Sequence, residues 1–180
     1  METLKTIQTL SKIGKILSNI VFVCCIVGGC LCIAGILGLA FGGDTLKLGG
    51  VTVHGLIENK EGLSDAMLYT AMGTGIVACI AEAVVAKFAE IYFRNELADG
   101  DPFTFRGAKE LLRLGILTIA IPLGTVILCS IGINIVDNYY PGADTLFSGE
   151  YTTVGLGIAM IVTSLFFRYG AELKGDADLG

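Results

Sequence analysis

The sequence predicts an all-α membrane protein, folded as a four-helix transmembrane bundle in a single domain over residues 1–180. Three observations support this prediction. The mean hydropathy is +0.75, and 16% of the residues are charged, against about 25% in soluble domains. The apolar residues gather in four long runs separated by polar stretches. Lysine and arginine are distributed unevenly among those stretches, as in multi-pass membrane proteins.

The first apolar run predicts a span over about residues 16–41. It exceeds the ~20 residues that a helix needs to cross the hydrocarbon core. Three lysines precede it, as they would in a signal peptide: Lys5, Lys12 and Lys15. However, the run is longer than the apolar region of a signal peptide, which covers about 7–15 residues. We therefore expect an uncleaved first helix.

The polar stretch 42–65 is rich in glycine and contains two short segments, 45–48 and 51–56, on either side of Gly49-Gly50. This pattern is typical of a β-hairpin with a two-residue turn. An isolated two-stranded ribbon is only marginally stable in water. The sequence thus favours, at most, a short β-hairpin in the first extracytoplasmic loop.

The second span is expected over about residues 66–86, with the helix continuing to about residue 96 because apolar residues recur there at helical spacing. Gly100 and Pro102 then interrupt the pattern. Either Asp101 or Thr104 can cap the helix that follows.

The third span is expected over about residues 114–136. Pro122 lies inside it and removes one backbone hydrogen bond, which predicts a kink. The fourth span is expected over about residues 151–167. The polar tail that begins at Arg168 is expected to fray.

The distribution of lysine and arginine predicts the topology. The N-terminal segment holds three of them, the segment 87–113 five and the C-terminal tail two. The loop 42–65 holds two, and the loop 137–150 holds none. Because positively charged loops stay in the cytoplasm, both termini and the 87–113 segment are expected on the cytoplasmic side.

Small residues recur at every fourth position in three of the apolar runs, a pattern that lets helix backbones approach closely. The first run has Cys30, Ala34, Gly38 and Gly42, the second Ala71, Gly75, Cys79 and Ala83, and the fourth Gly155, Ala159 and Thr163. Packing within the bundle is the favoured interpretation. A homo-oligomer, or contact with another membrane protein, is the alternative.

Two ionisable residues are candidates for a function. Glu82 is the one acid expected at membrane depth, where an ionisable group is a functional hypothesis. Pairing with Lys87 or Arg113 is the favoured interpretation, and a proton or substrate role is the alternative. His54 lies in the outer loop among carboxylates and is a weak candidate for an extracytoplasmic signal. A single imidazole is poor evidence for a metal site, so a solvated loop is favoured.

No other pattern predicts chemistry. All six cysteines fall inside apolar runs, which argues against a disulfide scaffold and favours packing over soft-metal binding. No metalloprotease, nucleophile-elbow or phosphate-loop motif occurs in the sequence. We therefore expect no enzymatic activity, no cofactor and no metal. The formal charge of −5 gives no reason to expect direct nucleic-acid binding.

The segment 87–113 holds the densest charge in the chain. Glu90 with Arg94, and Arg106 with Glu110, are spaced to pair along a helix. The segment can be read either as a solvated turn or as a docking surface with aromatic anchors beside positive charge. The residues of the docking hypothesis are Phe103, Phe105, Arg106, Lys109 and Arg113.

The turn Gly100-Asp101-Pro102-Phe103-Thr104 and the basic, leucine-rich helix start after it resemble a bacterial family of small four-span membrane proteins, the domain-of-unknown-function 2975 family. The resemblance covers nearly the whole chain in span number and loop length. It implies the bacterial cytoplasmic membrane as the location. Family members are often encoded beside a small helix-turn-helix regulator, which implies a DNA-binding protein as a soluble partner.

These observations lead to a non-enzymatic membrane protein that acts as a sensor, anchor or regulatory partner and docks a soluble cytoplasmic protein through 87–113. The alternative is a transport, efflux or self-immunity component. Residues that could line a polar passage for that alternative are Thr70, Thr74, Thr118 and Glu82.

Overall fold

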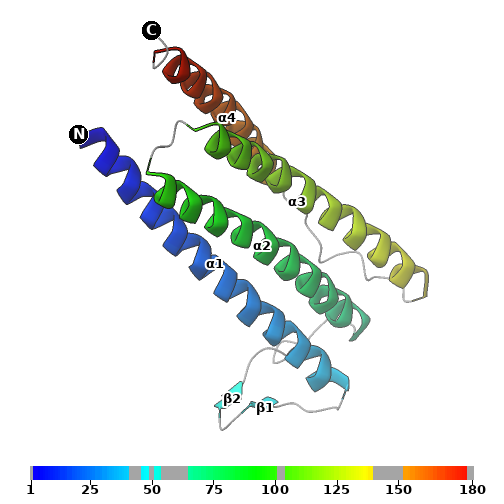
Figure 1. Cartoon of the computed structure of the whole chain (residues 1–180). Coiled ribbons are helices and arrows are strands. Elements are labelled where there is room, and N and C mark those ends of the chain that lie inside the picture. The colour runs from blue at the N-terminus through cyan, green and yellow to red at the C-terminus, as the bar shows by residue number, and fades with distance from the viewer. Residues whose placement is uncertain are drawn as a thin grey trace. The chain divides into compact units, whose positions relative to one another are not determined.

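The computed structural model describes residues 2–40, 46–48, 51–53, 65–100, 104–139 and 152–177. These residues form four helices and one pair of short strands (Figure 1). The helices are α1 (Glu2–Ala40), α2 (Asp65–Asp99), α3 (Phe105–Tyr139) and α4 (Thr152–Ala177). The predicted all-helical class is confirmed for this part of the chain.

Three helices are long and apolar enough to cross a membrane, over Gln8–Ala40, Phe105–Tyr139 and Val154–Lys174. Many of their large apolar side chains point outward. Leu17 on α1 is 60% exposed and Leu128 on α3 is 66% exposed. An apolar surface of this extent is unfavourable in water and favourable against lipid. The chain is therefore a membrane protein. α2 is not among these three helices.

The helices extend well beyond the predicted spans. α1 begins at Glu2, and α4 continues to Ala177. The prediction of a frayed tail from Arg168 onward is wrong for the described residues, because Arg168 Nε lies 3.2 Å from Glu172 Oε1 and Ala171 is buried. The buried Ala171 packs this segment within the first unit, and the exposed Arg168–Glu172 pair contributes little. α3 passes through Pro122 as one helix, and the expected kink stays a prediction.

Two three-residue strands lie between α1 and α2, namely β1 (Leu46–Leu48) and β2 (Val51–Val53). They pair antiparallel, with Leu46 opposite Val53 and Leu48 opposite Val51. The two glycines between the strands lie outside the described residues, as does His54. The location of this strand pair on the outer side of the membrane stays a prediction.

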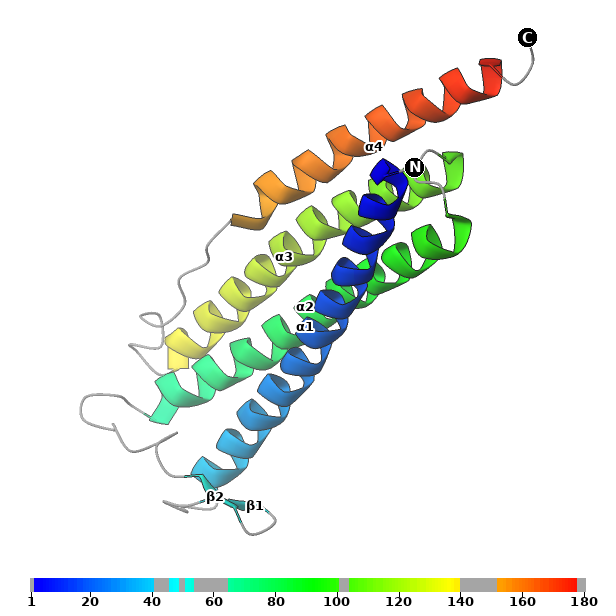
Figure 2. The ribbon, with the colours of Figure 1, turned by 90° about the vertical axis from the view of Figure 1, so that its left-hand side faces the viewer.

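The chain divides into two compact units. The first unit comprises Met1–Val23, Glu82–Leu123 and Tyr151–Gly180, and the second comprises Cys24–Ala81 and Gly124–Glu150. Within each unit, the segments of α1 and α2 run in opposite directions (Figure 2).

The core of the first unit is formed by Tyr92, Leu111 and Leu114, which are 6%, 6% and 3% exposed. Aromatic and apolar side chains of α2 and α4 pack against this core: Phe88, Ala89, Phe93, Met160 and Phe167. The rings of Tyr92 and Phe93 meet edge to face, with their centroids 5.2 Å apart. These contacts hold α2, α3 and α4 together in the first unit.

α3 and α4 approach closely at two glycines of the first unit. A Cβ added at Gly157 would lie 2.9 Å from the backbone oxygen of Gly115, and one added at Gly115 would lie 3.0 Å from the backbone oxygen of Gly157. Each glycine therefore faces the backbone of the other helix. Only residues without a side chain permit such an approach.

In the second unit, α1 and α2 pack through small side chains and methionine. A Cβ at Gly35 would lie 2.6 Å from Met72 Sδ, and one at Gly28 would lie 3.2 Å from Cys79 Sγ. Gly75 faces Cys32 in the same way, at 3.1 Å from its Sγ. Gly75 and Cys79 of the predicted small-residue pattern therefore do pack within the fold.

The small-residue pattern predicted on α4 does not pack within the fold. Gly155, Ala159 and Thr163 are exposed, and a Cβ at Gly155 would meet nothing within 4 Å. α4 instead turns Gly157 and Ile161 toward α3. The prediction failed because spacing alone does not say which of several helix faces is the packed one.

Candidate functional site: an exposed basic face at the start of α3

The end of α2 and the start of α3 are both capped by described residues. Gly100 adopts φ +70°, and its N–H donates a hydrogen bond to the Glu96 carbonyl over 3.1 Å. A left-handed glycine in this position is a common way to end a helix. At the start of α3, the Gly107 N–H donates to Thr104 Oγ1 over 3.0 Å. Thr104 is therefore the helix cap, which was one of the two predicted candidates.

Side chains also tie α2 to α3 next to the turn. Asn95 Nδ2 donates to both carboxylate oxygens of Glu110, over 3.1 and 3.0 Å. Arg106 Nε donates to the same carboxylate over 3.2 Å, which confirms the predicted pair. Because Glu110 bonds to both helices, it fixes the first turns of α3 against the end of α2.

In the other predicted pair, Glu90 with Arg94, the main partner of Glu90 is Lys87 instead. Lys87 Nζ lies 2.5 Å from Glu90 Oε2. This hydrogen bond lowers the pKa of Glu90, and the charges of Lys87, Arg94 and Lys15 act in the same direction. Arg94 thus assists at longer range. The Lys87 ammonium also lies over the Phe22 ring of α1, 5.2 Å from its centroid.

A buried polar cluster joins α1 to α2 in the first unit. Ser11 and Tyr92 are 3% and 6% exposed, and both hydrogen-bond with the Glu96 side chain. Burial raises the pKa of Glu96, although these two hydrogen bonds oppose the shift. Burial, followed by the nearby charges of Glu96 and Glu110, raises the pKa of Tyr92 well above its usual value.

Sequence reasoning missed this cluster. Ser11 precedes the expected first span, and Glu96 marks the expected end of the helix that continues the second span. The available signal was helical spacing on α2, where Tyr92 and Glu96 lie one turn apart.

The predicted docking residues that the structure describes lie on one face of the first turns of α3. Phe105 is 58% exposed, and Arg106, Lys109 and Arg113 are exposed as well. We call these four residues the basic face. The opposite side of the helix carries the buried residues Ala108, Leu111 and Leu114. Phe103 lies outside the described residues.

The residues of the basic face differ in how they are held. The Arg113 guanidinium stacks on the Phe88 ring, 5.3 Å from its centroid, and Arg106 pairs with Glu110. Lys109 is in none of the three ion pairs found among the described residues. Two of the three cations are thus oriented by α2 or α3, and the face presents fixed positive charge beside an exposed ring.

Glu82 is exposed on α2. The two cations suggested as its partners engage other groups, Lys87 with Glu90 and Arg113 with Phe88. Pairing of Glu82 with either of them stays a prediction, as does a proton or substrate role.

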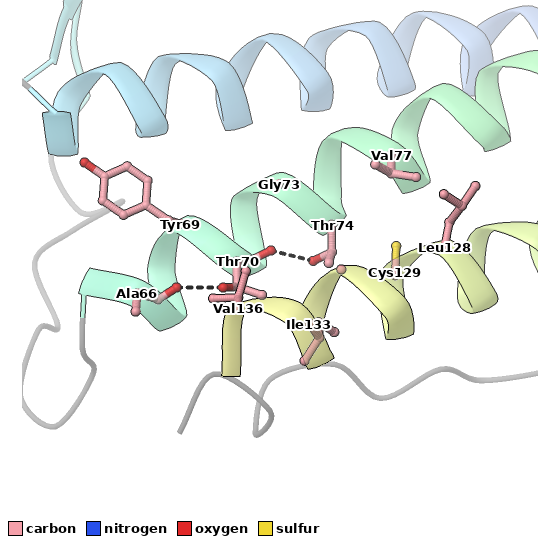
Figure 3. Close-up of a pocket in the computed structure, with 11 residues that line it drawn as sticks. Ala66, Tyr69, Thr70, Gly73, Thr74, Val77, Leu128, Cys129, Ile133 and Val136 are labelled. Atoms are coloured by element: carbon pink, nitrogen blue, oxygen red, sulfur yellow. Dashed lines mark hydrogen bonds between the residues drawn. The ribbon is translucent and has the colours of Figure 1, made fainter. Parts of the chain in front are cut away.

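The second unit contains a cavity of about 770 Å³ between α2 and α3 (Figure 3). Its lining is formed by Ala66, Tyr69, Thr70, Gly73, Thr74, Val77, Leu128, Cys129, Gly132, Ile133 and Val136. Thr70 and Thr74 were suggested for a polar passage, but their hydroxyls donate to carbonyls of their own helix, to Ala66 over 2.8 Å and to Thr70 over 2.9 Å. Thr118 and Glu82 belong to the first unit.

In the described ranges, no group of three or more histidine, cysteine or acidic side chains is placed to hold a metal ion. The six cysteines are free thiols.

Comparisons with known proteins identify no relative. No protein-family model matches the chain, and no curated protein or solved structure matches it either.

Proposed function

We propose that this chain is a non-enzymatic, multi-pass protein of the bacterial cytoplasmic membrane that docks a soluble cytoplasmic protein on its basic face. The observation that carries the proposal is the arrangement of Phe105, Arg106, Lys109 and Arg113. An exposed aromatic ring flanked by oriented cations is typical of the residues that dominate protein interfaces.

The proposal requires α2 to be a fourth span, and the distribution of charge supports this. Basic residues precede the apolar part of α1 and also open α3, so both helices are expected to enter the membrane from the cytoplasmic side. A chain that leaves α1 on the outer side must return across the membrane before α3 begins. α2 is the helix available for that crossing, and within each unit its segment runs antiparallel to that of α1.

The scaffold behind the basic face favours docking over a loosely solvated turn. The caps at Gly100 and Thr104 and the bonds from Asn95 to Glu110 fix the first turns of α3. A partner that meets a preordered surface pays less conformational entropy on binding. The resemblance of the 100–104 turn to the four-span family suggests a small helix-turn-helix regulator as that partner.

The test is an affinity purification from native membranes in mild detergent, with companions identified by mass spectrometry. We expect a soluble protein in stoichiometric amount with the native chain. Replacing Arg106, Lys109 and Arg113 by alanine should reduce its recovery by about tenfold or more, since truncating a single interface hot spot, a class enriched in arginine, costs about 2 kcal/mol or more.

The matched control removes the same charge elsewhere in the first unit, by replacing Lys12, Arg168 and Lys174 with alanine. This variant should retain the partner. Equal loss in both variants would indicate a general effect of charge, and full retention in both would contradict docking on the basic face. Recovery of an ATPase or of another membrane protein would favour the alternative of transport, efflux or self-immunity.

A further inference from the structure

The proposed docking does not use the cavity of the second unit, whose lining is mostly apolar. The hydroxyls of Thr70 and Thr74 are occupied by carbonyls of their own helix. Most of the remaining lining is aliphatic, with Cys129 and two glycines. Apolar cavities stay dry and accept apolar ligands. The volume of about 770 Å³ lies within the range of ~300–1,000 Å³ that ligand sites occupy.

The length of the cavity matches one leaflet of a bilayer. On α2 its lining extends from Ala66 to Val77, which is about 16 Å at ~1.5 Å per residue. On α3 it extends from Leu128 to Val136, or about 12 Å by the same rise. The hydrocarbon core of a membrane is about 30 Å thick, so that one leaflet is ~15 Å deep.

One end of the cavity lies beside polar residues. α2 begins at Asp65, and Asp137 lies in the last turn of α3. Tyr69 is 38% exposed near the same end, and tyrosine favours the boundary between hydrocarbon and headgroups. The other end, toward Val77 and Leu128, lies deeper in the apolar part of these helices.

We propose that this cavity holds one acyl chain of a membrane phospholipid, with the headgroup level with Tyr69. The chain enters between α2 and α3 and runs toward Val77 and Leu128. Recognition is by shape and apolar contact, because the threonine hydroxyls donate to their own helix and Cys129 contributes only a weakly polar thiol. The surrounding lipid supplies this occupant directly, since α3 has the length and composition of a membrane-crossing helix.

Two glycines widen the cavity. A Cβ added at Gly73 or Gly132 would meet nothing within 4 Å. They differ from Gly28 and Gly35 of α1, where an added Cβ would press on α2. Gly73 and Gly132 therefore do not serve close helix packing. A larger side chain at either position can enter the space that the proposal assigns to the acyl chain.

The experiment uses the full chain in vesicles of phosphatidylcholine and phosphatidylglycerol. A small fraction of the lipid carries a photoreactive diazirine midway along one acyl chain, and adducts are mapped by peptide mass spectrometry. In the native chain, adducts on 66–77 and 128–136 should saturate as the probe fraction rises. Adducts around the exposed Ile116 should rise in proportion to the probe, as expected for bulk lipid.

The replacements Gly73→Leu and Gly132→Leu together should lower adducts on the two lining segments by about tenfold, because they fill the space that the chain needs. Gly124→Leu is the matched control. Gly124 lies on α3, as Gly132 does. A Cβ added there would also meet nothing within 4 Å, and Gly124 does not line the cavity. The control should label like the native chain.

Adducts on the lining segments that rise linearly with the probe, or that persist in a helical double variant, would overturn the proposal. If the native chain is a dimer and its lining segments carry no adducts, the cavity is filled by a second copy of the chain. This result would also overturn the proposal. If the double variant does not fold, as judged by helical circular dichroism and gel filtration, the saturation measured on the native chain decides alone.

Discussion

Replacing Gly157 with alanine should force α3 and α4 apart. The added Cβ would contact Ile119 and would lie 2.9 Å from the backbone oxygen of Gly115. A flexible side chain can turn away from such a contact, but a backbone carbonyl cannot. The helices must therefore separate locally and give up part of the packing around the buried interface.

The magnitude follows from a comparison with Gly155, which lies two residues earlier on the same helix. Alanine at either position gains up to about 1 kcal/mol of helix propensity relative to glycine. At Gly155 nothing lies within 4 Å of the new Cβ, so this gain should be retained. At Gly157 overpacking should cost about 1–3 kcal/mol. Because the propensity gain is common to both variants, their difference in the free energy of unfolding measures the overpacking alone.

The assay is thermal unfolding in mild detergent, followed by helical circular dichroism. A difference of 1–3 kcal/mol corresponds to about 3–9 °C between the two variants for a chain of this size, with Gly157→Ala the less stable. Equal midpoints for the two variants would refute the close approach of α3 and α4. A lower midpoint for Gly155→Ala would show that the exposed face of α4 is covered in the isolated protein.

Three further predictions concern the first unit. Glu96→Gln should raise the melting temperature at neutral pH, because the folded state raises the pKa of this carboxyl and so disfavours its charged form. The gain should be absent below the usual pKa of 4.5, where the carboxyl is protonated in the folded and the unfolded state alike. A gain that is independent of pH would contradict this origin. Leu114→Ala should cost about 2–5 kcal/mol as a buried truncation, measured by denaturant titration, whereas Leu165→Ala, at a position that is 56% exposed, should cost little in detergent. Thr104→Ala removes the hydroxyl that accepts the Gly107 N–H and should cost about 0.5–2 kcal/mol; recovery of stability by serine but not by valine would identify the lost bond as the cause.

Much of the helical framework could be predicted, because apolar run length and the break at Gly100 are local properties of the sequence. The helix ends were less predictable. The segment before Ile16 and the segment after Arg168 are polar in composition, yet both belong to helices. Their stability comes from contacts with other segments, such as that of Gly14 with the Phe93 ring, and spacing along one segment does not report such contacts.

The basic face could be located from charge density and helical spacing, and its four described residues do lie on one side of α3. The cluster of Ser11, Tyr92 and Glu96 could not be located from the sequence, because it depends on the register of α1 against α2. The cavity could not be predicted from the sequence either, since it depends on the absence of side chains at Gly73 and Gly132 as much as on the residues that line it. The three-dimensional arrangement was also needed to tell which of several small-residue faces packs against a neighbouring helix.

The outward-facing side chains of α1 bear on how the protein is made. Apolar residues are exposed around most of this helix, among them Ile16, Leu17, Ile26 and Ile33. A nascent segment with that surface can leave the translocation channel and partition into lipid without a neighbouring helix to shield it. We therefore expect α1 to integrate alone and to wait in the bilayer until α2, which is synthesised later, closes against its glycines. Biogenesis would then proceed by insertion first and assembly second.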